Sequence, residues 1–287
     1  MPCSGHWKMA EEAAADDPLP PSRQTTADAL PVPARRILIV GASNVTLAFP
    51  LLLNACVTQA PCPVQLFTAH GHGRSFCQRS FVLHRGLPSV IGCGIWEVLA
   101  LQPPVAESWA LVTDLGNDLI YGRPIDMAWE RVLQVFRKIA ELKMPLTFVR
   151  PPLERILQLS EARYKIIKQM LFPGPTVPWS RMCEQIVELD RRATEYADHA
   201  GARILTPKVN WYGVDPIHIR KSRRLAAWNE IVSSWPFPDP PVVKPVGKTE
   251  ALRAWQSPPL ERSYWGRSYQ TPQPCRTFAD GSSLWQY

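Results

Sequence analysis

The stretch Arg36-Ile-Leu-Ile-Val-Gly-Ala-Ser43-Asn44 ends an apolar run at a glycine and then presents a serine. Continuous Ile and Val residues bounded by a turn residue are typical of a strand that is buried on both faces of a parallel sheet. Gly41 allows a sharp turn, and residues 44–60 have the length and the Leu/Ala content of a helix. We therefore expect Ser43 at a strand-to-helix corner on the carboxyl edge of the sheet, where α/β proteins place their chemistry.

The corner by itself admits two other interpretations. Serine is a frequent N-cap residue, so Ser43 could serve only to cap the helix. Val-Gly-Ala-Ser also begins like the dinucleotide-binding turn of short-chain dehydrogenases, but residues 44–47 supply no further glycine for the approach of a pyrophosphate. The next apolar run, residues 64–68, does not end in the acidic residue that would hold a ribose. An NAD(P)-binding oxidoreductase of the Rossmann type stays open as an alternative.

The distribution of proline predicts three regions. Of the 30 prolines, six precede Ala34 and nine lie in residues 236–287. We expect a flexible N-terminal arm over residues 1–34, a catalytic domain over 35–235 and a Pro/aromatic-rich C-terminal tail over 236–287, with both ends irregular.

The remaining composition indicates a protein of the cytoplasm. The N-terminal segment lacks the basic and then apolar pattern of a secretory signal, and the apolar runs are too short for a membrane span. Seven scattered cysteines do not form a disulfide framework. The net charge of +7 is more typical of a solvated surface than of a nucleic-acid-binding protein.

Apolar runs and helical patterns alternate along residues 35–235. This alternation predicts a five-stranded, doubly wound parallel sheet flanked by helices. Pro50 is awkward inside the first helix, which should therefore kink or start late, near Thr46. The expected strands are residues 36–40, 64–69, 109–113, 146–149 and 202–206, and the expected helices are 44–60, 125–143, 153–172, 181–199 and 221–235.

Asp215-Pro-Ile-His218, which follows the last expected strand, has an informative spacing. Over one turn of chain the carboxylate can accept a hydrogen bond from the imidazole Nδ1–H, so that Nε2 faces a serine hydroxyl. An ordinary surface turn is the alternative. A serine nucleophile also needs donors for the oxyanion, each worth roughly 3 to 4 kcal/mol by removal. Candidates at the same edge of the sheet are the backbone N–H groups of Ser43 and Gly73 and the side-chain amide of Asn117.

Taken in order, these blocks resemble the SGNH hydrolase superfamily, the GDSL-type esterases and lipases, over residues 35–235. The resemblance implies a flavodoxin-like α/β sandwich, with Ser43 as nucleophile, His218 as general base and Asp215 as the residue that orients it. It also implies Gly73 and Asn117, together with the Ser43 N–H, as oxyanion donors. Ala42 departs from the family aspartate of the first block, Leu115 departs from the glycine of the third, and Gly71 is a second candidate for the glycine of the second.

We therefore expect an esterase-type serine hydrolase that cleaves a carboxylic ester or thioester through an acyl-enzyme, with no cofactor and no metal. Its partner would be a small-molecule acyl ester, and its activity should fall once His218 is protonated at acid pH. A non-hydrolytic acyltransferase or binding relative is a further alternative. The basic group Arg220, Lys221, Arg223 and Arg224 could then grip an anion, although a solvated helix face is the simpler interpretation. Neither the acyl and alcohol specificity nor the oligomeric state follows from the sequence.

Three other patterns are weaker. His70-Gly-His72 could ligate a metal, but it has no nearby carboxylate or cysteine partner, so a loop that exposes its backbone is the better interpretation. Tyr164 and Lys168 have the spacing of a dehydrogenase Tyr-x-x-x-Lys pair without the cofactor glycines. In the tail, aromatic residues alternate with arginines, which we expect to cover part of the core rather than to bind nucleic acid; these are Trp255, Tyr264, Trp265, Tyr269, Trp285 and Tyr287.

Overall fold

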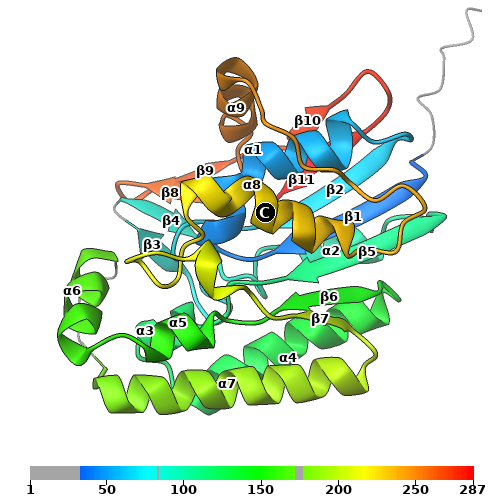
Figure 1. Cartoon of the computed structure of the whole chain (residues 1–287). Helices are drawn as coiled ribbons and strands as arrows, with labels where there is room; N and C mark the ends of the chain where they lie inside the picture. The colour runs from blue at the N-terminus through cyan, green and yellow to red at the C-terminus, as the bar shows by residue number, and fades with distance from the viewer. Residues whose placement is uncertain (1–32, 83, 172–176) are drawn as a thin grey trace, which may run out of the picture. The chain divides into compact units, whose positions relative to one another are not determined.

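A seven-stranded sheet lies at the centre of the described part of the chain, residues 33–82, 84–171 and 177–287 of the computed structural model (Figure 1). Its strand order is β10-β11-β2-β1-β5-β6-β7. The strands are β1 (Arg35–Val40), β2 (Val64–Ala69), β5 (Glu107–Val112), β6 (Leu146–Val149), β7 (Arg203–Leu205), β10 (Arg276–Thr277) and β11 (Ser283–Gln286). The run β2-β1-β5-β6-β7 is parallel throughout, which confirms the predicted doubly wound sheet.

Successive strands of the chain are added to the sheet on opposite sides of β1. β2 follows β1 in sequence and pairs on one side of it, whereas β5, β6 and β7 are added in turn on the other side. In open α/β sheets, ligands bind beyond the carboxyl ends of the strands at the point where the side of addition changes. The topology therefore brings Ser43, which follows β1, and Asp114, which follows β5, to the same point of the sheet edge.

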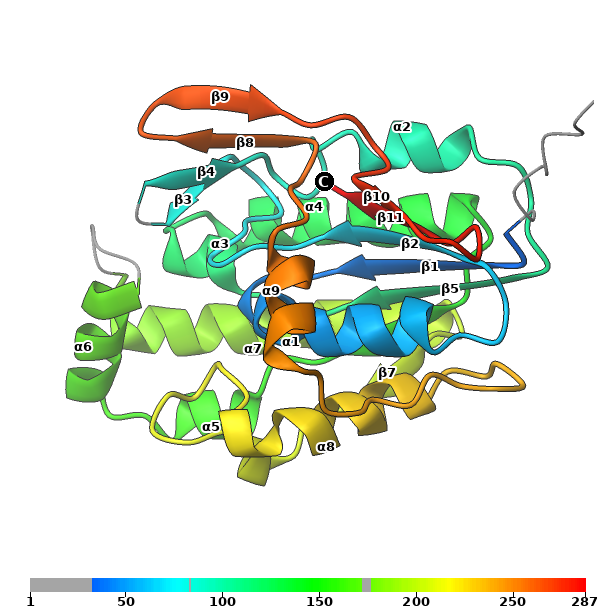
Figure 2. The ribbon, with the colours of Figure 1, turned by 90° about the horizontal axis from the view of Figure 1, so that it is seen from above.

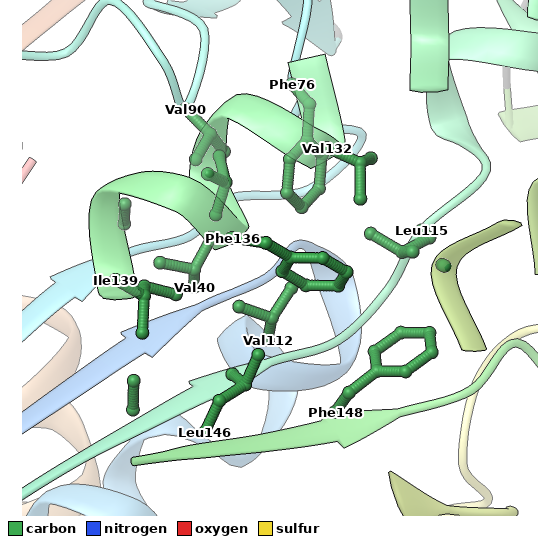
Figure 3. Packing of buried hydrophobic residues seen from close by; sticks show 14 of the residues in the cluster. Val40, Phe76, Val90, Val112, Leu115, Val132, Phe136, Ile139, Leu146 and Phe148 are labelled. Carbon is green, nitrogen blue, oxygen red and sulfur yellow. The ribbon is translucent and has the colours of Figure 1, made fainter. Parts of the chain in front are cut away.

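Side chains on the two faces of the sheet enter two separate cores because successive residues of a strand point to opposite faces. From β1, Ile37 and Ile39 join the core under α1, α8 and α9, and Leu38 and Val40 join the core under α2, α4 and α7. The second core is drawn in Figure 3, and Figures 1 and 2 show the two helical layers. The helices are α1 (Ser43–Leu53), α2 (Ile95–Ala100), α3 (Asn117–Ile120), α4 (Ile125–Glu141), α5 (Leu153–Leu157), α6 (Glu161–Leu171), α7 (Trp179–His199), α8 (Lys221–Ser233) and α9 (Lys248–Trp255).

Helix α1 begins at the predicted corner. It includes Pro50 and passes after Leu53 into one π-helical segment, η1 (Asn54–Thr58). The expectation of a late start near Thr46 is therefore wrong. Another side chain, the Asp114 carboxylate, binds the free N–H groups of the first turn and so stabilises the early start.

The expectation of an irregular C-terminal arm is also wrong. Strand β11 pairs in parallel with β2, so that Leu284 lies opposite Leu66, and β10 pairs with β11 at the edge of the sheet. Leu284 is fully buried, and the Trp285 ring stacks on Phe67 with ring centroids 5.1 Å apart. The tail therefore extends the central sheet, and the packing of Leu284 and Trp285 stabilises this pairing. Most of the predicted N-terminal arm, residues 1–32, lies outside the described residues.

A second, four-stranded sheet was not predicted. Its order is β3-β4-β8-β9, and every pair is antiparallel. It pairs residues 80–87 with residues 261–270 of the C-terminal tail. The strands are β3 (Ser80–Val82), β4 (Arg85–Leu87), β8 (Glu261–Tyr264) and β9 (Arg267–Gln270).

The single helix predicted for residues 153–172 is two helices, α5 and α6. Ser160 separates them, since its carbonyl accepts from Tyr164 N–H at 2.9 Å and its hydroxyl accepts from Arg163 N–H at 3.4 Å, as an N-cap residue does. Phe172, the last residue of the predicted helix, lies outside the described residues. Within the described ranges, no helix combines the length and the apolar character that a bilayer crossing requires.

Candidate active site

Gly41 permits the close approach of three chain segments at the turn between β1 and α1. A Cβ atom at Gly41 would lie 2.5 Å from Val45 Cγ2 and 2.9 Å from Thr113 Cγ2. Both distances are shorter than real Cβ contacts, so a side chain would force the start of α1 away from β5. The residue type of the turn is therefore fixed by packing, and Ser43 follows as the first residue of the helix.

Ser43, His218 and Asp215 form a hydrogen-bonded series. The ring Nε2 of His218 lies 2.7 Å from Ser43 Oγ, and Nδ1 lies 2.6 Å from Asp215 Oδ2. Because a carboxylate can only accept, Nδ1 carries the proton and Nε2 is free to accept from the serine hydroxyl. Ser43 is not the N-cap residue, a position that Ala42 occupies. The structure thus brings together the three predicted residues from opposite ends of the core.

Asp215 is held by its own turn. Its Oδ1 accepts hydrogen bonds from the backbone N–H groups of Ile217 at 3.0 Å and His218 at 3.2 Å. Burial raises the pKa of Asp215, but the hydrogen bonds from His218 and from the two backbone groups outweigh burial and bring the pKa below its usual value. The carboxylate therefore stays ionised while it orients the imidazole.

Asp114, which follows β5, caps α1 from a different segment of the chain. Its Oδ2 accepts from the N–H groups of Ala42 and Asn44, both at 2.9 Å, and from Val45 N–H at 3.4 Å. The first N–H groups of a helix have no partner within the helix and carry partial positive charge. An ionised side chain satisfies them here, which fixes the backbone on both sides of Ser43. Asp114 itself has φ of 61°, an uncommon left-handed conformation for a residue other than glycine.

Asn44 was not predicted as a site residue. Its Nδ2 donates to Asp114 Oδ1 and to the carbonyl of Ile217, both at 2.8 Å, and its Oδ1 accepts from Ile219 N–H at 2.8 Å. The side chain is buried and uses both ends of its amide. A polar amide at the first turn of an otherwise apolar helix is the sequence signal that could have drawn attention to it.

The predicted oxyanion donors lie on two loops that are bound to each other. Asn117 Nδ2 donates to the carbonyl of Arg74 at 2.9 Å, and Tyr121 Oη donates to the carbonyl of Gly73 at 2.7 Å. Gly73 has φ of 61°, which favours glycine. Asn117 and Ser43 line the same cavity, whereas Gly73 is not among the residues that line it. The roles of these donors stay predictions.

The buried side chain of Arg74 holds the loop of residues 70–75 in place. This side chain is fully buried, and its Nη1 donates to the carbonyl of His70 at 3.2 Å and to the carbonyl of Tyr287. The C-terminal tail thus contributes directly to the placement of the loop that carries Gly73.

A cavity of about 90 Å³ lies against Ser43 on the β5 and β6 side of the sheet. Ser43, Asn44, Asp114 and Asn117 supply polar atoms at one part of its wall. The rest of the wall is mostly apolar and comes from α5 to α7 with their connections, from residues 211–219 and from α8. Its apolar side chains include Ile156, Leu159, Ile167, Trp179, Met182 and Ile186, and Arg150 and Lys168 also line it. A wall of this composition favours an apolar group next to the serine.

The two other motifs lie in different places, and Tyr164 and Lys168 both line the cavity next to Ser43. Tyr164 Oη donates to the carbonyl of Val177 at 3.0 Å, and burial raises the pKa of Tyr164 and lowers that of Lys168. His70 Nδ1 lies 2.9 Å from Thr46 Oγ1, and burial lowers its pKa to about 3. No group of three His, Cys, Asp or Glu side chains that could hold a metal ion occurs in the described residues.

No family model matches the sequence, and no curated protein matches it. Among solved structures, the chain is similar to a GDSL-like lipase from Bacteroides thetaiotaomicron, with 10% identity, a TM-score of 0.45 and coverage of 71% of this chain and 89% of that one. It is also similar to the acetyl xylan esterase AlAXEase, with 14% identity, a TM-score of 0.42 and coverage of 68% and 100%. A third similar structure is the psychrotrophic esterase EstA from Pseudoalteromonas sp., with 15% identity, a TM-score of 0.38 and coverage of 69% and 95%.

Proposed function

We propose that the protein is a serine hydrolase that cleaves a carboxylic ester or thioester through an acyl-enzyme on Ser43. The observation that carries this proposal is the hydrogen-bonded series from Ser43 Oγ through the His218 ring to Asp215, with distances of 2.7 and 2.6 Å. A nucleophile next to a base that is oriented by a third group is the arrangement that activates a serine hydroxyl.

We propose a step for each group. His218 Nε2 accepts the hydroxyl proton as Ser43 Oγ bonds to the carbonyl carbon, and the carbonyl electrons move to oxygen. The oxyanion then reforms the carbonyl, and the C–O or C–S bond to the leaving group breaks as His218 returns the proton to the leaving atom. Water, deprotonated by the same ring, releases the acyl group from Ser43. Asp215 keeps the imidazole in the required tautomer and stabilises its positive charge.

Two donors are available to the oxyanion beside the serine. The N–H of Ser43 makes no hydrogen bond to any described residue, although its neighbours on both sides are bound to Asp114. Asn117 uses one N–H of its amide for the carbonyl of Arg74, which leaves the second one available. We assign the Gly73 N–H as the third donor on its place in the loop that Asn117 and Tyr121 hold.

The lining of the cavity supports an apolar acyl group in the substrate. Its wall is mostly aliphatic and aromatic, and Ser43 lies at its polar part. An apolar chain in this cavity would be removed from water, which is favourable in proportion to the apolar area buried.

The test is turnover of a panel of nitrophenyl esters with short to long acyl chains, run with the unmodified protein and with Ser43→Ala and His218→Gln. We expect hydrolysis of at least one ester, and a loss of at least about 10³-fold in both variants. Labelling by a fluorophosphonate, mapped by mass spectrometry, should modify Ser43.

Ser233→Ala is the matched control, because Ser233 is an exposed helical serine whose hydroxyl contacts only the Glu230 carbonyl. It should leave turnover and labelling unchanged. Hydrolysis that survives Ser43→Ala would contradict the proposal, and so would tight NAD(P)H binding with no hydrolysis of any ester.

A further inference from the structure

Two arginines without a carboxylate partner share one face of the small sheet. Arg85 of β4 lies opposite Tyr264 of β8, and Arg262 precedes Tyr264 by two residues. Residues two apart on a strand point to the same face, so Arg85, Arg262 and Tyr264 are neighbours on it. None of the ion pairs among the described residues includes Arg85 or Arg262.

This face lies next to the loop that precedes Gly73. Leu87 shares the face with Arg85 and packs on the loop so closely that a Cβ atom at Gly71 would lie 2.1 Å from Leu87 Cδ1. The next residue, His72, has a pKa lowered by burial and then by the charges of His218 and Arg85. The same loop contacts the first turn of α1, since His70 Nδ1 lies 2.9 Å from Thr46 Oγ1. Figures 1 and 2 show the small sheet at the end of the molecule toward which β1 and β2 point.

Neither guanidinium group is neutralised by a carboxylate among the described residues. The Arg85 Nε atom is buried and has no hydrogen-bond partner among the described residues. Burial lowers the pKa of Arg85; Tyr264 partly opposes this shift, and the charge of Arg262 adds to it. Among the described residues, the Arg262 side chain donates to the neutral Thr271 hydroxyl at 2.8 Å and lies over the Tyr269 ring, 5.7 Å from its centroid. Two like charges held together in a partly buried place would be stabilised by an anion, which the planar guanidinium binds through paired hydrogen bonds.

The arginines and the apolar cavity lie on opposite sides of Ser43. No residue between positions 70 and 87 lines the cavity. Its wall comes from the ends of β5 and β6, from α5 to α7, and from residues 211–219 with α8. The arginines belong to the side of β2, and β1 with its serine lies between β2 and β5. An ester whose acyl chain occupies the cavity would therefore direct its leaving group toward the arginines.

We propose that Arg85 and Arg262, with Tyr264, bind an anionic group, a carboxylate or a phosphate, on the leaving alcohol or thiol of the substrate. This inference rests on the proposed hydrolase function. The substrate would then carry an apolar acyl chain on one side of the scissile bond and a negative charge on the other.

The test uses pairs of substrates that differ in charge at the leaving group. One pair is the hexanoyl esters of 4-hydroxybenzoate and of 4-hydroxybenzamide, and the other is hexanoyl thioesters of phosphopantetheine and of pantetheine. We expect the unmodified protein to prefer the charged member of at least one pair by about tenfold in kcat/KM. Which pair shows the preference distinguishes a carboxylate from a phosphate.

Arg85→Gln should abolish that preference, mainly through KM, and should leave kcat/KM for the neutral members within about twofold. Arg85→Lys should retain part of the preference. Arg137→Gln, an exposed arginine on α4, removes the same charge elsewhere and should change nothing. Arg223→Gln tests the rival basic group on α8 and should also have no effect.

Equal kcat/KM for charged and neutral members in the unmodified protein would overturn the inference, as would an equal loss on both members in Arg85→Gln. A preference that Arg223→Gln abolishes would transfer the anion site to α8 and overturn it too. In each of these cases, hydrolysis of the neutral members still supports the hydrolase assignment. Absence of turnover for every member would overturn that assignment and this inference together.

Discussion

The side chain of Asn44 and the backbone of Ile219 are joined by a hydrogen bond of 2.8 Å, although 175 residues separate them in sequence. The same side chain binds the carbonyl of Ile217, so it holds the chain on both sides of His218. Through Asp114 it is also tied to the turn that presents Ser43. One amide thus fixes the nucleophile turn and the base loop relative to each other.

Asn44→Ala should lower kcat about 100-fold while KM changes little. The variant loses three hydrogen bonds of roughly 1 kcal/mol each and leaves the backbone groups around His218 without their partners. The ring should then populate orientations in which Nε2 does not face Ser43. Steady-state kinetics on the best ester of the panel measures the effect.

Asn229→Ala is a matched control. Outside the catalytic series, Asn229 Oδ1 accepts a hydrogen bond of 3.0 Å from the backbone N–H of Val243. We expect this substitution to reduce the free energy of unfolding by about 1 kcal/mol and to leave kcat unchanged. A similar kcat in both variants would show that Asn44 contributes to stability alone.

Asp215→Asn should reduce kcat/KM by about 10² to 10⁴-fold with the fold intact. The amide would donate to His218 Nδ1, which moves the ring proton to Nε2 and removes the acceptor for the Ser43 hydroxyl. Kinetics together with circular dichroism separates this loss from unfolding. Asp126→Asn, which changes an exposed ion-pair carboxylate on α4, should leave kcat/KM unaltered. Near-normal turnover in Asp215→Asn would exclude Asp215 as the orienting residue.

Gly41→Ala should destabilise the protein by about 1 to 3 kcal/mol and reduce turnover, because the new methyl group meets Val45 and Thr113 at less than 3 Å. Urea unfolding and ester hydrolysis report the two effects. In Gly247→Ala the added methyl group meets nothing within 4 Å, and φ is −64°, so its free energy of unfolding should change by less than about 1 kcal/mol. Equal stability of the two variants would contradict the close approach at Gly41.

His70 should make the protein less stable at acid pH. Its Nε2 is buried without a partner, and burial lowers its pKa to about 3, while an unfolded chain takes up this proton near pH 6.5. The contribution is therefore fully present above about pH 6.5 and is lost as the pH falls toward 3. Between pH 7 and pH 5 it should remove about 2 kcal/mol from the free energy of unfolding.

His70→Asn keeps a donor for Thr46 but has no group that titrates in this range. The loss of stability between pH 7 and pH 5 should be smaller in this variant than in the unmodified protein by about 2 kcal/mol, as measured by urea unfolding. An identical loss in both proteins would show that other groups cause the acid sensitivity.

The sequence predicted the parallel sheet well because β1, β2, β5 and β6 are short, mostly apolar and largely buried, and such a composition indicates burial directly. Strand β7 is only partly buried. The sequence did not predict β8 to β11. Strand β9, Arg-Ser-Tyr-Gln, is exposed throughout, and β11 is built from residues whose pairing with β2 is decided by contacts more than 200 positions away. Proline content in the tail indicated irregular chain, but the prolines lie before β8 or between β9 and β10 and not within any of these strands.

The helix breaks show the same limit on a smaller scale. Apolar spacing continues across residues 153–171, so the pattern alone cannot locate the break that the Ser160 cap introduces. The start of α1 depends on Asp114, which comes from another segment of the chain, and no local signal at Ala42 or Ser43 reports it.

The sequence by itself determined the parallel sheet, the glycine turn that delivers Ser43, and the Asp-x-x-His spacing, because each depends on neighbours within a few residues. Tertiary structure alone decided that Ser43 meets His218, that Asn44 and Asp114 bind the two loops together, and that the tail completes the sheet and supports Arg74. These contacts join segments far apart in the chain, and their geometry follows from the order in which the strands pair and from how the side chains pack between them.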